Sequence, residues 1–187
     1  MAASMGIYFD QTRCTGCYTC VVACKDWYDI AAAEVNLMRV SCIERGTFPD
    51  LFAAYLASPC YHCAQPPCIA ACPAAAITKR AADGIVVVDR DQCVGVDHCP
   101  QKCLKACPWN APQFGPEPNA KMQKCELCMD RLASGRQPVC VEACPMFALD
   151  AGPLEALQAR YGDGCEAEGF KFRERFNPSA IFKPKTK

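Results

Sequence analysis

The sequence predicts an α+β fold in which small hairpins and short helices surround metal centres. Three observations predict it. The chain has 187 residues and 18 cysteines, sixteen of the cysteines fall into four groups, and the segments between the groups are short. So many cysteines indicate a disulfide framework, zinc modules or iron–sulfur clusters. We therefore expect metal binding to supply much of the folding free energy, because little apolar core remains.

The segments between the cysteines predict few strands. Residues 6–10 and 36–44 alternate apolar and polar side chains, as strands do. Residues 76–79 and 85–89 flank an Asp-Gly pair at 83–84, which is typical of a β-hairpin.

The helices are expected to be short as well. Helical turns should lie near each third cysteine, as in residues 20–27 and 68–72, and a longer helix should span residues 154–161. Residues 113–119 have the composition of a loop. Residues 171–187 are basic, and we expect a tail with little core there.

Four groups of four cysteines form an internal repeat. They are Cys14, Cys17, Cys20 and Cys24; Cys60, Cys63, Cys68 and Cys72; Cys93, Cys99, Cys103 and Cys107; and Cys125, Cys128, Cys140 and Cys144. The first group has the spacing C-x2-C-x2-C-x3-C of bacterial two-cluster ferredoxins, where three cysteines hold one cluster and the fourth ligates the other. Such groups must occur in pairs, so four groups predict four [4Fe–4S] clusters. Cys42 and Cys165 lie outside the groups, and we expect them to be free.

Proline follows the last cysteine of three groups, as Pro73, Pro108 and Pro145. Proline disfavours the helical region for the residue before it, so these cysteines should be extended. The first group ends instead in Cys24–Lys25.

The position of the hairpin indicates which groups pair. It joins the second group to the third, so these two should form one contiguous ferredoxin-like unit at residues 50–115. The first and fourth groups should form another unit, from residues 1–49 and 116–150. The unit at residues 50–115 would then be an insertion in it. Residues 151–187 would be a C-terminal extension that serves as a docking tail.

Composition and motifs exclude several classes of function. The formal net charge is zero, and cluster thiolates would make it negative, so we expect no nucleic-acid partner. No stretch approaches the roughly 18 apolar residues of a membrane span, and the first ten residues do not resemble an export signal. No phosphate-binding or nucleophile motif is present, so we expect no catalytic residues and no enzyme activity of this polypeptide on its own.

Three stretches carry a family resemblance: CTGCYTCVVACKDW at 14–27, CYHCAQPPCIAACP at 60–73 and KCELCMDRLASGRQPVCVEACP at 124–145. With them, residues 5–150 resemble the four-cluster electron-transfer (beta) subunit of molybdenum/tungsten bis-pterin oxidoreductases, such as DMSO reductase, polysulfide reductase, formate dehydrogenase and phenylacetyl-CoA:acceptor oxidoreductase. The resemblance implies two partners: a large bis-pterin catalytic subunit facing the first cluster, and a membrane-anchor subunit or other electron carrier facing the fourth.

The resemblance also implies a ligand set for each cluster. These sets are Cys14, Cys17, Cys20 and Cys144; Cys24, Cys125, Cys128 and Cys140; Cys60, Cys63, Cys68 and Cys107; and Cys72, Cys93, Cys99 and Cys103. The third group departs from the family spacing, because Val96 stands where a second cysteine is expected. We expect Cys99 to replace it; a three-iron cluster or ligation by His98 is the alternative.

Two other functions remain open at this stage. One is a soluble polyferredoxin that serves a hydrogenase or CO dehydrogenase. The other is a zinc-binding interaction module, for which the C-x2-C pairs at Cys60/Cys63 and Cys125/Cys128 would be suited. The expected location is the cytoplasm, with membrane association through a partner; export to the periplasm together with a catalytic subunit is the alternative.

Overall fold

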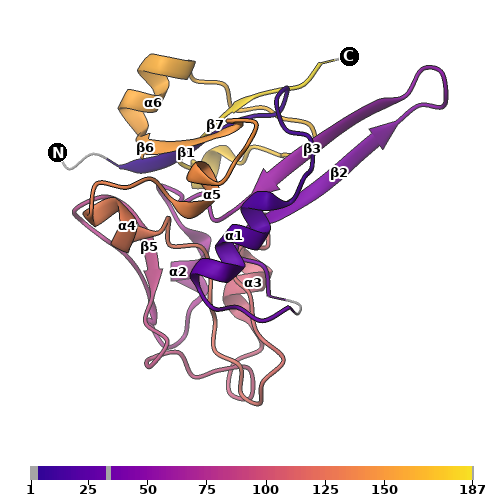
Figure 1. Ribbon diagram of the computed structural model, residues 1–187. Coiled ribbons are helices and arrows are strands. Elements are labelled where there is room, and N and C mark those ends of the chain that lie inside the picture. Colours follow the sequence, from indigo (N-terminus) through magenta and orange to yellow (C-terminus); the bar gives the residue numbers. More distant parts are fainter. Residues whose placement is uncertain (1–3, 33–34, 187) are drawn as a thin grey trace.

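The part of the chain that the structure describes folds into three small sheets and several short helices. The computed structural model describes residues 4–32 and 35–186. The first ten residues were expected not to be an export signal, and residues 1–3 of that segment lie outside the described residues. Figure 1 shows a sheet in the upper part of the molecule, a long two-stranded arm, and a lower part made of loops and short helices. None of the helices in the described ranges is long and apolar enough to cross a bilayer.

A three-stranded sheet joins the beginning and the end of the chain. Its strands are β6 (Leu149–Pro153), β1 (Met5–Asp10) and β7 (Ala180–Lys183), in that order. β1 pairs antiparallel with β6 and parallel with β7. The strand predicted at residues 6–10 is therefore confirmed, and it is the central strand of the sheet.

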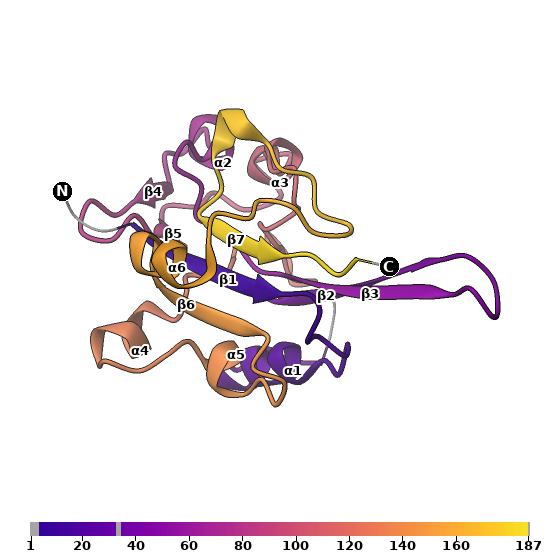
Figure 2. The ribbon, with the colours of Figure 1, turned by 90° about the horizontal axis from the view of Figure 1, so that it is seen from above.

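Both faces of this sheet are buried. Helix α6 (Leu154–Tyr161), confirmed with the predicted bounds, covers one face, where Tyr8 and Ile181 lie in its core. Figure 2 shows α6 in front of the sheet. Because successive side chains of a strand alternate, Phe9 and Phe182 point to the other face, into the core that contains the cysteine helices.

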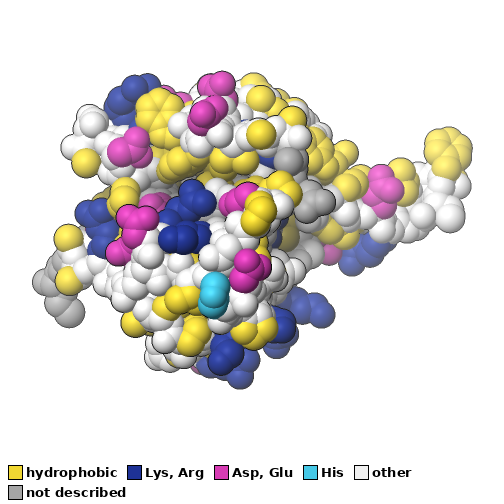
Figure 3. Space-filling view, turned by 90° about the horizontal axis from the view of Figure 1, so that it is seen from below, with side chains coloured by type: hydrophobic (Ala, Val, Ile, Leu, Met, Phe, Trp, Pro, Cys, Tyr) yellow, Lys and Arg dark blue, Asp and Glu magenta, His cyan; other side chains and the backbone are white. Residues whose placement is uncertain are grey.

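The two-stranded arm was only half predicted. The strand expected at residues 36–44 is β2 (Arg39–Arg45), and it pairs with β3 (Phe52–Ser58), which the sequence did not indicate. The arm projects from the body and carries hydrophobic side chains at its tip (Figure 3), where Phe48 is 93 % exposed. At its root, the ring of Tyr55 occupies the space that a side chain at Gly16 would need.

The remaining helices all contain or adjoin cysteines. They are α1 (Thr19–Trp27), α2 (Pro67–Ala71), α3 (Lys102–Ala106), α4 (Met129–Ala133) and α5 (Val139–Glu142). The predicted helical turns near the third cysteines are thereby confirmed. The predicted hairpin is confirmed as β4 (Ile77–Lys79) and β5 (Val86–Val88).

Proline sets the geometry of two fourth cysteines. Cys72 and Cys107 end α2 and α3 with ψ of 112° and 115°, the extended conformation that the following prolines favour. Cys24 has no proline after it, and α1 continues past it to Trp27. The sequence-based expectation for these residues is confirmed.

The expectation of a C-terminal tail with little core is wrong. A 3₁₀ turn at Glu174–Phe176 leads into β7, whose Ile181 and Phe182 are 2 % and 3 % exposed. The segment also supports the second cysteine group, because Ser179 donates hydrogen bonds through its backbone N–H to the Tyr61 carbonyl (2.8 Å) and through its Oγ to the His62 carbonyl (3.1 Å). The basic composition of residues 171–187 concealed a short apolar strand.

The last strand should therefore contribute strongly to stability. Phe182→Ala removes a ring that lies 4.3 Å from the ring of Phe170, centroid to centroid, and 5.8 Å from that of Tyr61. We expect a loss of about 3–5 kcal/mol, the usual cost of truncating a buried Phe. The denaturant midpoint of the anaerobic protein, followed by circular dichroism, measures it. Thr186→Ala, at an exposed site just beyond β7, is the control, and equal midpoints for the two variants would contradict the prediction.

Candidate metal centres

Two pairs of short helices bring distant cysteine groups together. Helix α1 packs against α5, and α2 packs against α3. Each of these four helices contains the third cysteine of one group. The fourth cysteine of that group lies inside the helix in α1, and just beyond the end of the helix in α2, α3 and α5. The fourth cysteine of one group therefore comes close to the first three of its partner group.

Three cavities are each lined by four cysteines, and in each case three come from one group and one from its partner. The lining cysteines are Cys14, Cys17, Cys20 and Cys144 (set I); Cys60, Cys63, Cys68 and Cys107 (set III); and Cys72, Cys93, Cys99 and Cys103 (set IV). The unfilled volumes, including the open mouths, are about 340, 340 and 370 Å³. Similar volumes and identical donor sets indicate the same kind of occupant in all three.

The remaining four cysteines, set II, are recognised by their mutual electrostatic effects. Burial, and next the neighbouring Cys125 and Cys128, raises the pKa of Cys24 to about 12. Burial and then Cys125, Cys128 and Cys24 raise the pKa of Cys140 well above its ordinary value. Cys24, Cys125, Cys128 and Cys140 therefore lie together.

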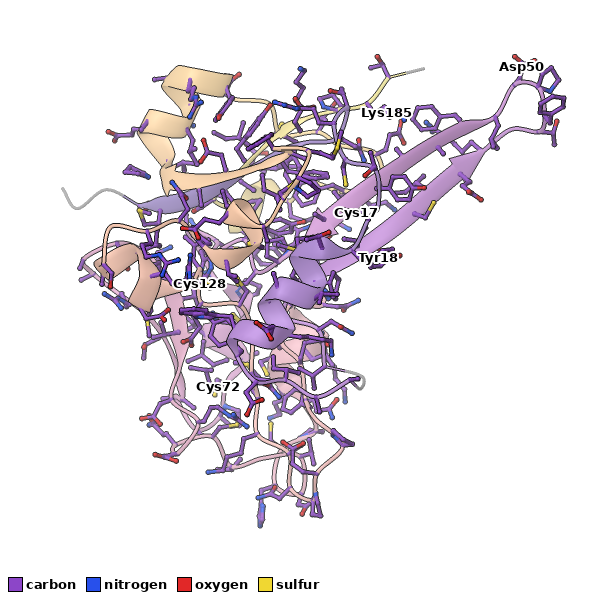
Figure 4. All side chains as sticks on the ribbon, in the orientation of Figure 1. Cys17, Tyr18, Asp50, Cys72, Cys128 and Lys185 are labelled. Atoms are coloured by element: carbon purple, nitrogen blue, oxygen red, sulfur yellow. The ribbon has the colours of Figure 1, made fainter. Side chains whose placement is uncertain are left out.

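The four sets follow one another in a line. Figure 4 shows Cys17 of set I near the root of the arm, Cys72 of set IV in the lower part of the molecule, and Cys128 of set II at an intermediate height. Beyond the effect of burial, thiols of adjoining sets raise the pKa of one another. Cys20 of set I raises the pKa of Cys140 of set II, and Cys60 of set III raises that of Cys125 of set II. Cys103 of set IV raises the pKa of Cys68 of set III.

Buried thiols in these sets hold their protons strongly when no metal is bound. Burial raises the pKa of Cys20, Cys63 and Cys68 to about 12 and that of Cys103 to about 11. A metal ligand is a thiolate, so metal binding must expel these protons. Cys17 differs: it is exposed, and hydrogen bonds from Thr19 lower its pKa.

Left-handed residues shape the loops between the first two cysteines of each group. Gly16, His62 and Leu127 have φ of 69°, 44° and 55°, and each directly precedes a second cysteine. In the third group the residue with this conformation is Gly95 (φ 79°), and the residue after it is Val96. The loop thus keeps the common shape as far as Val96, and Cys99 reaches the cavity from three residues further on.

The donor sets fit iron–sulfur clusters better than a single ion. Among the described residues, no three or more His, Cys, Asp or Glu side chains converge closely enough to hold one metal ion, whereas four cysteines surround each cavity. His98 is exposed and does not line the set IV cavity. His62 is buried, and its Nδ1 accepts a hydrogen bond from the Val86 backbone N–H (3.0 Å).

Two cations lie beside the cysteines: Lys124 is buried and Arg39 is half-buried. Lys124 directly precedes Cys125 and is 3 % exposed. Arg39 lies at the start of β2, far in sequence from any group, and no local signal could have placed it beside Cys107 and Cys60.

Comparison with known proteins supports the iron–sulfur interpretation. The family described as "4Fe-4S dicluster domain" matches residues 51–153. The sequence is 39 % identical over 192 residues to a chain of the anaerobic dimethyl sulfoxide reductase of Escherichia coli K12, covering 98 % of this protein and 90 % of that one. It is 34 % identical to a subunit of the sulfite dehydrogenase of Allochromatium vinosum (77 % and 66 % covered) and 34 % identical to the formate dehydrogenase-O iron-sulfur subunit of E. coli K12 (80 % and 53 % covered). The zinc alternative is therefore wrong: this is an iron–sulfur electron-transfer protein with several [4Fe–4S] clusters.

The loop of the third group should accept a regular second cysteine. Cys99→Ala should remove iron from set IV, and adding Val96→Cys should restore it, because Val96 follows a left-handed residue as the other second cysteines do. Iron per chain and the electron paramagnetic resonance (EPR) spectrum of the reduced protein check this. The matched control is Cys99→Ala with Asp97→Cys, one position further on. Equal rescue by both cysteines, or by neither, would contradict the prediction.

Proposed function

The protein belongs to the 4Fe-4S dicluster family and is related over nearly its whole length to a chain of anaerobic dimethyl sulfoxide reductases, and from this we propose that it carries electrons between two partner subunits through four [4Fe–4S] clusters. One partner is a large molybdenum or tungsten bis-pterin catalytic subunit. The other is a membrane-anchor subunit or another electron carrier. In this proposal the protein itself is not catalytic, and its grouped cysteines serve only to hold the clusters.

The observation that carries the proposal is the gathering of sixteen cysteines into four sets in line. We propose that each set ligates one cluster, with the fourth cysteine of every group serving the cluster of its partner group. Backbone N–H groups reach two of these fourth cysteines in the same way: Ala111 donates to Cys107 Sγ and Ala148 to Cys144 Sγ, both at 3.4 Å. Such hydrogen bonds stabilise negative charge on sulfur.

Set I, at one end of the line, has the exposure that electron exchange with a partner requires. Cys17 of set I is exposed, whereas Cys140 of set II is buried. Exposed apolar side chains lie close in sequence to the set I cysteines: Tyr18 and Val22 beside Cys17 and Cys20, and Phe147, 72 % exposed, after Cys144. Exposed apolar clusters of this kind are typical of protein interfaces, which supports docking of the catalytic subunit here.

The division into units follows from the same sets. We propose that sets I and II belong to one ferredoxin-like unit, from residues 1–49 and 116–150, and sets III and IV to an inserted unit at 50–115. Residues 151–187 complete the first unit through β7, and their basic residues remain available for docking. A cytoplasmic location with attachment to a membrane through a partner completes the proposal.

Metal content tests the number of clusters. Because four cubanes contain four iron and four sulfide each, we expect about sixteen of both per chain. Anaerobic iron and acid-labile sulfide analysis of the protein, with the protein concentration from amino-acid analysis, measures them. About eight iron per chain at full occupancy would limit the protein to two clusters.

Crossed ligation predicts which cysteines act together. Cys144→Ser should alter the EPR signal that Cys14→Ser alters, because both residues line the set I cavity. It should leave unchanged the signal that Cys125→Ser alters. Cys42→Ser, outside the groups, is the control and should change nothing. If Cys144→Ser and Cys125→Ser affected the same cluster, each group would hold its own cluster and the crossed assignment would fail.

A further inference from the structure

Two positively charged side chains lie where set II meets set III. Lys124 is buried, and it lines the set III cavity while its neighbour in sequence, Cys125, belongs to set II. Its Nζ donates a hydrogen bond to the carbonyl of Cys125, at 2.9 Å. The ammonium group is therefore close to both sets.

Arg39 reaches the same boundary from β2. Its guanidinium donates to the carbonyls of Ser58, two residues before Cys60, and of Trp109, two residues after Cys107. Burial lowers the pKa of Arg39, and Tyr61 and then the thiols of Cys107, Cys60 and Cys125 raise it. The first two of these cysteines belong to set III and the third to set II. Arginine keeps its charge at any pH that proteins tolerate, so a permanent positive charge lies beside this junction.

Neutral acceptors alone hold both cations in place. Arg39 donates to the carbonyls of Ser58 (3.2 Å), Trp109 (2.9 Å) and Asn110. Lys124 donates to the carbonyls of Cys125 (2.9 Å) and Val86. In the described parts of the chain, neither side chain forms an ion pair with a carboxylate.

A buried and a half-buried cation without a carboxylate need another counter-charge. An unpaired cation withdrawn from water opposes folding. A cluster with four thiolate ligands carries net negative charge, and sets II and III are the nearest donor sets. The cations and the two central clusters would therefore neutralise each other, with the carbonyls fixing where the positive charge lies.

We propose that the fixed positive charges of Arg39 and Lys124 raise the reduction potentials of the two central clusters, those of sets II and III. The inference rests on the proposed function, since it needs sets II and III to carry clusters. Reduction adds one electron and makes a cluster more negative, so a fixed cation nearby stabilises the reduced state. The effect is large in the interior, because charges interact more strongly at low dielectric than in water.

The test is an EPR-monitored redox titration of the intact protein and of charge-neutralising variants. Lys124→Met keeps the length of the side chain and removes its charge. The ratio of reduced to oxidised cluster in sets II and III should fall about tenfold or more at a given potential, which for a one-electron couple is a midpoint shift of about 59 mV to lower values. Arg39→Gln should shift the same two midpoints in the same direction, and those of sets I and IV should move much less. Cys128→Ser and Cys63→Ser identify the signals of sets II and III.

A matched lysine provides the control. Lys102 directly precedes Cys103 of set IV just as Lys124 precedes Cys125, but it is exposed. Water and salt screen its charge, so Lys102→Met should leave the set IV midpoint nearly unchanged. The charge-conserving changes Lys124→Arg and Arg39→Lys should keep the set II and III midpoints close to those of the unaltered protein.

Iron analysis of every variant separates the two proposals. Fewer than four clusters in the unaltered protein would contradict the proposed function itself. Four clusters with unchanged midpoints in Lys124→Met and Arg39→Gln, or equal shifts of all four clusters, would overturn the charge proposal alone. Depleted iron in both neutralised variants and in both charge-conserving variants would also overturn it, since the residues would then act only through packing.

Discussion

The structure depends on one constraint: the fourth cysteine of each group lies in a site formed mainly by another group. α1 and α5 must pack together, as must α2 and α3, before any set of four cysteines is complete. Residues about 120 positions apart, such as Cys20 and Cys144, are thereby brought to one cavity. Sheets and loops serve this requirement, and the apolar core gathers around the cysteine helices rather than apart from them.

Local chemistry made the cysteine sites predictable. Spacing within the groups, the prolines after Cys72 and Cys107, and the Asp-Gly turn each determine the backbone within a few residues. Their consequences appeared in the structure where expected. Group three kept the common loop shape through Gly95 even though Val96 replaced a cysteine, because the left-handed glycine, not the sulfur, determines the path of the chain there.

Long-range partners account for what sequence reasoning missed. β7 is four residues long in a basic segment, and only its pairing with β1 makes it a strand. β3 pairs with β2 in the arm, and the sequence predicted only β2. Arg39 shows the same limit at the level of a side chain: its neighbours Cys60 and Cys107 lie 21 and 68 positions away (60 − 39 and 107 − 39), and no short pattern connects them.

The parallel pairing of β1 with β7 has a consequence for synthesis. A ribosome releases the polypeptide from its beginning, so the second edge of β1 stays uncovered until residues 180–183 have emerged. The second and third cysteine groups, in residues 60–107, emerge together much earlier. The order of translation thus separates the two events in time, and the three-stranded sheet is completed only after β7 has emerged. A polypeptide that terminates before β7 would keep an open strand edge. Such an edge can pair with another polypeptide and promotes aggregation.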